Sequence, residues 1–228
     1  MTSTGVKLHG WLFRGKDSRT ILVCHGNSGN ILDLYRLIAY LRQTGCSVFV
    51  FDYQGFGRSQ GAPSMAGICQ DAKAAYDYVA KFTPADQIIL YGESLGGGVA
   101  CHIAQTEPTG GLILQSTFAD IRTISYQVFL PLGIYPELLY PKPFFNSLKM
   151  LSKYERPVLF IHGEKDKDVS IKHAELMFAA ASEPKLFVRL ANTGHEEIDD
   201  LDGEQFVEAL SRFLEPIRSQ TAAVQEAV

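Results

Sequence analysis

The feature that most constrains this chain is an alternation between short, continuous apolar runs and amphipathic segments. The runs are rich in β-branched and aromatic residues, and they are Ile21–Cys24, Val48–Phe51, Ile88–Tyr91, Leu112–Leu114, Val158–Ile161 and Leu186–Val188. Continuous runs of this length are typical of strands that are buried on both faces. We therefore expect a mostly parallel central sheet.

Between these runs, apolar residues recur at three- and four-residue spacing, which predicts helices. The first helix is expected over Ile31–Leu41 and should stop at Gly45, the second over Ile68–Val79, and the last around Phe206–Phe213. Strands that alternate with helices predict an α/β fold, in which right-handed crossovers place helices on both faces of the sheet.

Residues 118–151 interrupt this alternation with an aromatic segment. The part between Tyr126 and Phe145 carries Pro131, Pro136, Pro141 and Pro143. A chain of 228 residues can bury most of its apolar surface in one core. We expect a single domain over 1–219 with an insertion at about 118–151, followed by a frayed tail over 220–228.

Charge and cysteine content limit the possible partners and location. The formal net charge is −4 without a dense Lys/Arg patch, so we expect no nucleic-acid partner. Cys24, Cys46 and Cys101 lie among apolar neighbours, which predicts reduced, buried thiols and a cytoplasmic protein. Neither a signal peptide nor a run of roughly 20 apolar residues is visible, although an N-terminal anchor in a longer natural chain would escape this argument.

The strongest chemical signal is the segment Gly92-Glu93-Ser94-Leu95-Gly96, directly after an apolar run and before a Gly/Ala-rich helix. A serine on such a strand-to-helix turn projects its hydroxyl above the sheet edge and can act as a nucleophile. Gly92 and Gly96 would be needed because the helix passes close to the strand. The alternative is a glycine-rich turn that binds an anion at a helix start.

A nucleophilic serine needs a base to take its proton. Of the histidines after the insertion, His162 ends a buried run, whereas His173 and His195 lie in helix-edge or loop positions. His195 follows the last expected strand and Gly194, which favours it as the base over a solvated surface histidine.

The acid of a Ser-His-acid arrangement orients the imidazole and stabilises the imidazolium. Asp166 and Asp168 both follow the run Val158–Ile161, and either position fits. Asp120 is a third, weaker candidate, and at least one of these carboxylates is expected to be merely solvated.

The oxyanion of the tetrahedral intermediate requires backbone N–H donors. We expect one from Leu95, the residue after the nucleophile, and one from Asn27 in the loop after the first parallel strand. Asn30 in the same loop is the expected N-cap of the helix that follows.

Taken in order, five motifs resemble those of the α/β-hydrolase superfamily over nearly the full chain. They are His25-Gly-Asn27, Asp52–Ser59, Gly92–Gly97, His162-Gly-Glu-Lys-Asp166 and Gly194-His195. The resemblance is to small carboxylesterases and depalmitoylase-like α/β-hydrolase-domain proteins. It implies an α/β-hydrolase fold with Ser94, His195 and Asp166 as the catalytic triad, and it favours Asp166 over Asp168. It also implies a structural role for Asp52 and Arg58.

The aromatic insertion falls where a lid covers the active site in this superfamily. Phe129 and Leu138 are our candidate substrate-binding residues for an acyl chain, since apolar walls suit an apolar substrate. Two alternatives are docking to a membrane surface or a partner, and packing of the lid on its own domain.

The expected activity is hydrolysis of small or lipid-like acyl esters through an acyl-enzyme intermediate. Removal of S-acyl chains from proteins uses the same chemistry, and a non-catalytic binding protein of the same fold is a further alternative. A cysteine nucleophile at Cys24 beside His25 is disfavoured because adjacent strand residues point to opposite faces. No metal or nucleotide motif is present, so neither metal nor cofactor is expected, and the oligomeric state cannot be read from the sequence.

Overall fold

A computed structural model describes residues 1–128, 142, 145–195 and 197–225. Its strands are β1 (Gly10–Phe13), β2 (Thr20–Cys24), β3 (Ser47–Phe51), β4 (Ile88–Glu93), β5 (Gly111–Gln115), β6 (Val158–Gly163) and β7 (Lys185–Leu190). Its helices are α1 (Tyr35–Gln43), α2 (Met65–Val79), α3 (Leu95–Thr106), α4 (Ile121–Val128), α6 (Ser147–Leu151), α7 (Lys172–Ala180) and α8 (Gly203–Gln225), with short 3₁₀ turns at Ala85–Gln87 and Asp200–Asp202.

The seven strands form one sheet in the order β1-β3-β2-β4-β5-β6-β7. Only β1 runs antiparallel, pairing Gly10 with Phe51 of β3, and every other neighbouring pair in the described sheet is parallel. The six apolar runs are confirmed as the parallel strands. Because their carboxyl ends share one edge of the sheet, the loops that follow β4, β6 and β7 lie together there.

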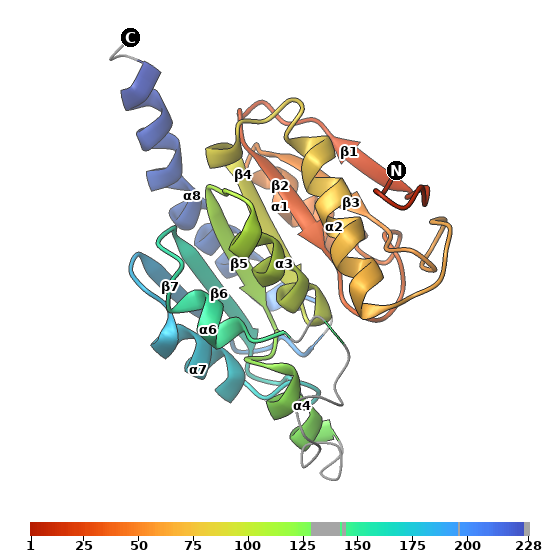
Figure 1. Cartoon of the computed structure of the whole chain (residues 1–228). Helices are drawn as coiled ribbons and strands as arrows, with labels where there is room; N and C mark the ends of the chain where they lie inside the picture. The colour runs from red at the N-terminus through yellow and green to blue at the C-terminus, as the bar shows by residue number, and fades with distance from the viewer. Residues whose placement is uncertain (129–141, 143–144, 196, 226–228) are drawn as a thin grey trace.

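Helices cover both faces, as the alternation predicts (Figure 1). Ile21 and Val23 of β2 pack with α1 and α8 on one face, whereas Leu22 and Cys24 pack with α2 and α3 on the other. Successive strand residues thus serve opposite halves of the core. All four cysteines are free and buried, and Cys24 is fully buried. This confirms the prediction of reduced, buried thiols at Cys24, Cys46 and Cys101 and adds Cys69 to them.

The start of the first helix differs from expectation. Helix α1 begins at Tyr35, and residues 31–34 form a turn instead. The prediction that Asn30 is the N-cap is wrong, because its side-chain oxygen accepts from the N–H of Leu32 within this turn, at 3.0 Å. The turn is held by Asp52, whose carboxylate accepts from the N–H of Ile31 at 3.0 Å and from the N–H of Arg58 at 3.2 Å.

The two ends of the insertion are tied together by backbone hydrogen bonds. The N–H of Ile121 donates to the carbonyl of Phe145 at 3.1 Å, and the N–H of Ser147 donates to that of Ala119 at 2.9 Å. Phe129 and Leu138 lie outside the described residues. Helix α8 continues to Gln225, so the described part of the expected tail is helical.

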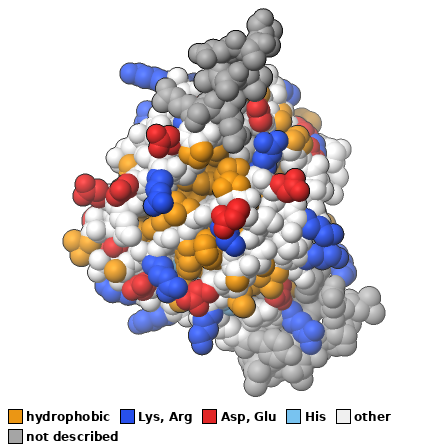
Figure 2. Space-filling model, turned by 90° about the vertical axis from the view of Figure 1, so that its left-hand side faces the viewer, with side chains coloured by type: hydrophobic (Ala, Val, Ile, Leu, Met, Phe, Trp, Pro, Cys, Tyr) orange, Lys and Arg blue, Asp and Glu red, His pale blue; other side chains and the backbone are white. Residues whose placement is uncertain are grey.

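Strand β7 is an edge of the sheet, and Leu186, Phe187 and Val188 are only half-buried. Figure 2 views the molecule from the side on which β7 lies in Figure 1, and it shows hydrophobic side chains gathered among charged ones. Charged residues along β7, Lys185 and Arg189, are typical of protected edge strands. None of the helices in the described part of the chain has the length and apolar character to cross a bilayer.

Candidate active site

Ser94 occupies the sharp turn between β4 and α3. Its backbone is in a rarely populated region, with φ 50° and ψ −118°. The end of β5 and the loop after it support this conformation: the N–H of Ser94 donates to the carbonyl of Gln115 at 3.0 Å, and Thr117 Oγ1 donates to the carbonyl of Ser94 at 2.6 Å. Strain of this kind persists only where the surroundings over-determine it, and it is typical of functional sites.

The glycines around Ser94 allow a close approach of backbone to backbone, as predicted. A Cβ on Gly92 would lie 2.5 Å from the carbonyl oxygen of Gly96. A Cβ on Gly96 would lie 2.0 Å from the carbonyl oxygen of Cys24, at the end of β2. Helix α3 can therefore start directly against the strands, and this closeness fixes the position of Ser94.

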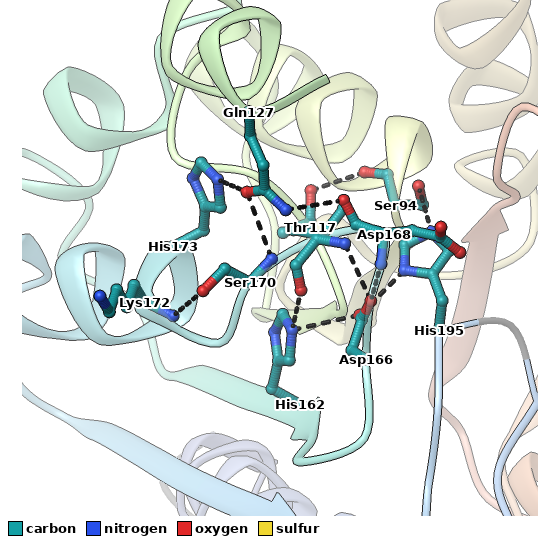
Figure 3. A network of polar contacts seen from close by, with 11 residues as sticks. Ser94, Thr117, Gln127, His162, Asp166, Asp168, Ser170, Lys172, His173 and His195 are labelled. Carbon is teal, nitrogen blue, oxygen red and sulfur yellow. Dashed lines mark hydrogen bonds and ion pairs between the residues drawn. The ribbon is translucent and has the colours of Figure 1, made fainter. Parts of the chain in front are cut away.

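His195 lies in the loop between β7 and α8, and its imidazole lies between Ser94 and Asp166 (Figure 3). Nε2 is 3.0 Å from Ser94 Oγ, and Nδ1 is 2.9 Å from Asp166 Oδ2. Because a carboxylate only accepts, Nδ1–H must be the donor to Asp166. A neutral ring then leaves Nε2 as the acceptor for the Ser94 hydroxyl proton.

Asp166 follows β6, and its side chain is fully buried. Oδ1 accepts from the N–H groups of Asp168 at 2.9 Å and Val169 at 2.8 Å. Burial alone would raise the pKa of Asp166, but hydrogen bonds from His162, His195 and Val169 outweigh it and hold this pKa well below its usual range. The carboxylate therefore stays ionised at neutral pH.

The charges around His195 favour its protonated form. Burial alone would lower the pKa of His195, but the hydrogen bond to Asp166 and the charges of Asp166, Asp168 and Glu93 raise it above its ordinary value of 6.5. These carboxylates stabilise the imidazolium that forms when a base accepts a proton.

The other candidate side chains are not hydrogen-bonded to Ser94 or His195 in the described structure. Asp168 is exposed, and Asp120 accepts from the N–H of Thr123 at 2.8 Å at the start of α4. His173 is buried and bonds Gln127 at 3.0 Å. Burial raises the pKa of the Cys24 thiol to about 12, which removes it as a nucleophile.

The two expected oxyanion donors belong to segments that lie next to Ser94. Leu95 is the first residue of α3, and the first N–H groups of a helix lack partners within it. Asn27 belongs to the loop after β2, which approaches Ser94 closely: a Cβ on Gly26 would lie 3.5 Å from Ser94 Cβ.

A cavity of about 480 Å³ opens above Ser94 and His195. The described part of its wall is rich in carboxylates, and the acidic residues among the lining are Asp33, Glu93, Asp168 and Glu197. Leu34 is the large apolar side chain of this part of the wall. The described wall is therefore part apolar and part polar, and its acidic side chains include Glu197, which pairs with Arg36 at 3.4 Å.

One group of potential metal ligands occurs among the described residues. Ligand atoms of Asp166, Asp168 and His195 lie within 4.8 Å of one another. Both oxygens of Asp166 and Nδ1 of His195 already take part in hydrogen bonds, so a metal would have to displace them. The arrangement fits an acid–base pair better than a cation site.

Two residues of this network were not singled out from the sequence. His162, which is fully buried at the end of β6, lies 3.2 Å from Asp166 Oδ2. Gln127, on α4, donates from its side-chain amide to the carbonyl of Asp168 at 3.0 Å. The signal for His162 was present, since it opens the His-Gly-x-x-Asp motif, whereas nothing in the sequence marks Gln127.

Comparison with known proteins gives consistent results. The family described as serine aminopeptidase, S33 matches residues 15–141. The Mycobacterium tuberculosis protein Rv2307c is 35% identical over 221 residues, covering 93% of this chain and 76% of the relative. The Arabidopsis thaliana alpha/beta hydrolase domain-containing protein WAV2 is 32% identical over 94% of this chain and 76% of its own length.

Among solved structures, the Pyrococcus furiosus esterase Pf2001 matches with a TM-score of 0.78 and 17% sequence identity. The match covers 95% of this chain and 88% of that one. At this level of identity the likeness shows the shared α/β-hydrolase fold.

Proposed function

Because this chain belongs to the serine aminopeptidase S33 family of α/β-hydrolases, we propose that it is a serine hydrolase that cleaves acyl esters. The observation that carries the proposal is the placement of His195, which bridges Ser94 Oγ at 3.0 Å and Asp166 Oδ2 at 2.9 Å. Nucleophile, base and orienting acid thus stand in hydrogen-bonding order.

The reaction begins when His195 Nε2 takes the proton of Ser94 as Oγ attacks the ester carbonyl. Asp166, ionised and hydrogen-bonded to Nδ1, stabilises the imidazolium. The N–H groups of Leu95 and Asn27 are our proposed donors to the oxyanion. His195 then gives its proton to the leaving alcohol, and the same base activates the water that releases the acid from Ser94.

The direct test is hydrolysis of p-nitrophenyl esters from acetyl to palmitoyl by the wild type, Ser94→Ala and Ser116→Ala. Ser116 is a matched control because it shares the unusual backbone, with φ 46°, while its buried hydroxyl has no hydrogen-bond partner among the described residues. We expect turnover by the wild type and Ser116→Ala, and none above background by Ser94→Ala. Loss of activity in both variants, or in neither, would contradict the assignment.

The finer choice of substrate calls for matched oxygen esters and thioesters of one acyl chain, with an aminoacyl p-nitroanilide as a peptidase substrate. Faster thioester cleavage would favour removal of S-acyl groups from proteins, and a chain that cleaves none of these compounds would favour a binding protein. A cytoplasmic location, acyl binding at Phe129 and Leu138, and membrane contact through the insertion stay predictions.

A further inference from the structure

His162 contacts the carboxylate that orients His195. It lies at the end of β6, four residues before Asp166, and its side chain is fully buried. Nε2 lies 2.8 Å from the carbonyl oxygen of Val169. It also lies 3.2 Å from Asp166 Oδ2, toward which it points in Figure 3. Two oxygens therefore face one ring nitrogen.

This environment selects one tautomer of His162. A bare nitrogen would repel two oxygens that can only accept, so the proton belongs on Nε2. Nδ1 agrees with this choice, because it is buried and has no hydrogen-bond partner in the described structure. An unpartnered acceptor at Nδ1 is less costly than an N–H donor that is buried there without an acceptor.

The contacts of His162 link both ends of the turn formed by residues 166–169. Asp166 Oδ1 accepts from the N–H of Val169 at 2.8 Å, and the carbonyl of the same Val169 accepts from His162. Oδ2, the atom that His195 binds, lies 3.2 Å from the same Nε2 of His162. The histidine thus holds both the turn and the oxygen that orients the base.

We propose that His162 is a positioning residue for the triad, whose Nε2–H fixes Asp166 Oδ2 in the direction of His195. The inference rests on the proposed function of Ser94, His195 and Asp166. Without His162, Oδ2 has one hydrogen-bond donor fewer, and the carboxylate can rotate about its Cβ–Cγ bond. The negative charge on Oδ2 is then no longer partly neutralised by the His162 N–H. Oδ2 therefore stabilises the His195 imidazolium more strongly when it is hydrogen-bonded to Nδ1.

The test compares His162→Leu, His162→Gln and the wild type as full-length proteins. The glutamine amide places an N–H donor near the position of Nε2, whereas leucine fills the space without a donor. His102→Gln serves as a matched control, because His102 is half-buried on α3, where its ring lies 6.3 Å from that of Phe145. Each protein is assayed for kcat/KM against pH with a short p-nitrophenyl ester and for its Tm.

We expect His162→Leu to lose ~10- to 100-fold in kcat/KM, since a hydrogen bond to a charged group is removed. The acid limb of its pH profile should move to higher pH, while His162→Gln and His102→Gln stay within about threefold of the wild type. The described charged groups that face His195, namely Asp166, Asp168 and Glu93, are unchanged in every variant. A purely structural role would lower the Tm and the active fraction without moving this limb.

An acid limb that stays or moves down in His162→Leu, or a glutamine variant no better than leucine, would overturn the assignment. Long-range ¹H–¹⁵N spectra of the histidine rings supply a reading without turnover: His162 should be protonated at Nε2, and His195 should titrate at higher pH in His162→Leu. If no ester is cleaved, the proposed function fails while these spectra still decide the role of His162. A ring protonated at Nδ1 would rule that role out.

Discussion

Replacing Asp166 with asparagine separates the two carboxylates that follow β6. In the structure, Asp166 accepts two backbone N–H bonds at Oδ1, at 2.8 and 2.9 Å, and binds His195 at Oδ2, at 2.9 Å. An asparagine whose carbonyl keeps the backbone bonds must turn its NH₂ group toward His195. Nδ1 then has to accept, the proton moves to Nε2, and the base can no longer take a proton from Ser94.

The expected loss follows from this change of tautomer. It amounts to about 10⁴ in kcat, a figure measured for the same exchange in another serine hydrolase triad, and corresponds to about 5.5 kcal/mol of transition-state stabilisation. Asp168→Asn is the matched control. Its exposed side chain is not bonded to His195, and its backbone N–H still donates to Asp166, so less than about threefold should be lost.

The assay is kcat/KM with a short p-nitrophenyl ester, with the Tm of each variant measured to show that the fold is intact. If Asp168→Asn lost most of its kcat/KM while Asp166→Asn kept a value close to that of the wild type, the reasoning from the hydrogen-bond geometry would be refuted. Equal, small losses in both would show that the base is oriented in another way.

Three further outcomes are expected. The acid limb of kcat/KM should lie above pH 6.5, because neutral His195 is the base and its pKa is raised; an inflection below 6.5 would contradict the electrostatics of the site. Gly96→Ala should cost about 3 kcal/mol or more of unfolding free energy in urea titrations, since its Cβ would lie 2.0 Å from a backbone carbonyl oxygen. Gly194→Ala is the control: its Cβ would meet open space, so the unfolding free energy should change by less than about 0.5 kcal/mol. A cationic ester should be cleaved faster than an anionic one of equal length, by a factor that shrinks with added salt, because Asp33, Asp168 and Glu197 line the cavity; preference for the anionic ester would refute this.

Most of the fold could be predicted from the sequence because buried parallel strands leave continuous apolar runs. Strand β1 was missed for the opposite reason: Gly10–Phe13 is an edge strand whose residues are exposed or half-buried, so it leaves no such run. The start of α1 was misplaced because Ile31 and Leu34 fit the helical spacing, although residues 31–34 form a turn tied to Asp52.

The candidate site was predictable where chain order and local motif agree, as for Ser94 and His195. Strand position alone does not separate Asp166 from Asp168, because both follow the same strand. The resemblance favours Asp166, and the structure adds a backbone N–H of Asp168 that donates to Asp166 at 2.9 Å. His162 ends a buried apolar run, and such a position is typical of a core residue. Its contact with Asp166, four residues later in the chain, depends on the turn over 166–169. This turn brings Asp166 and Val169 back against the end of β6.

The most direct test of the central claim is the reaction of the protein with a fluorophosphonate, read by intact mass and by sequencing of the labelled peptide. This reagent reports an activated serine without requiring the natural substrate. We expect one adduct, on Ser94, that forms far more slowly in His195→Ala and is absent from Ser94→Ala. Stoichiometric labelling elsewhere, or no labelling of the folded wild type, would contradict a nucleophile activated by His195.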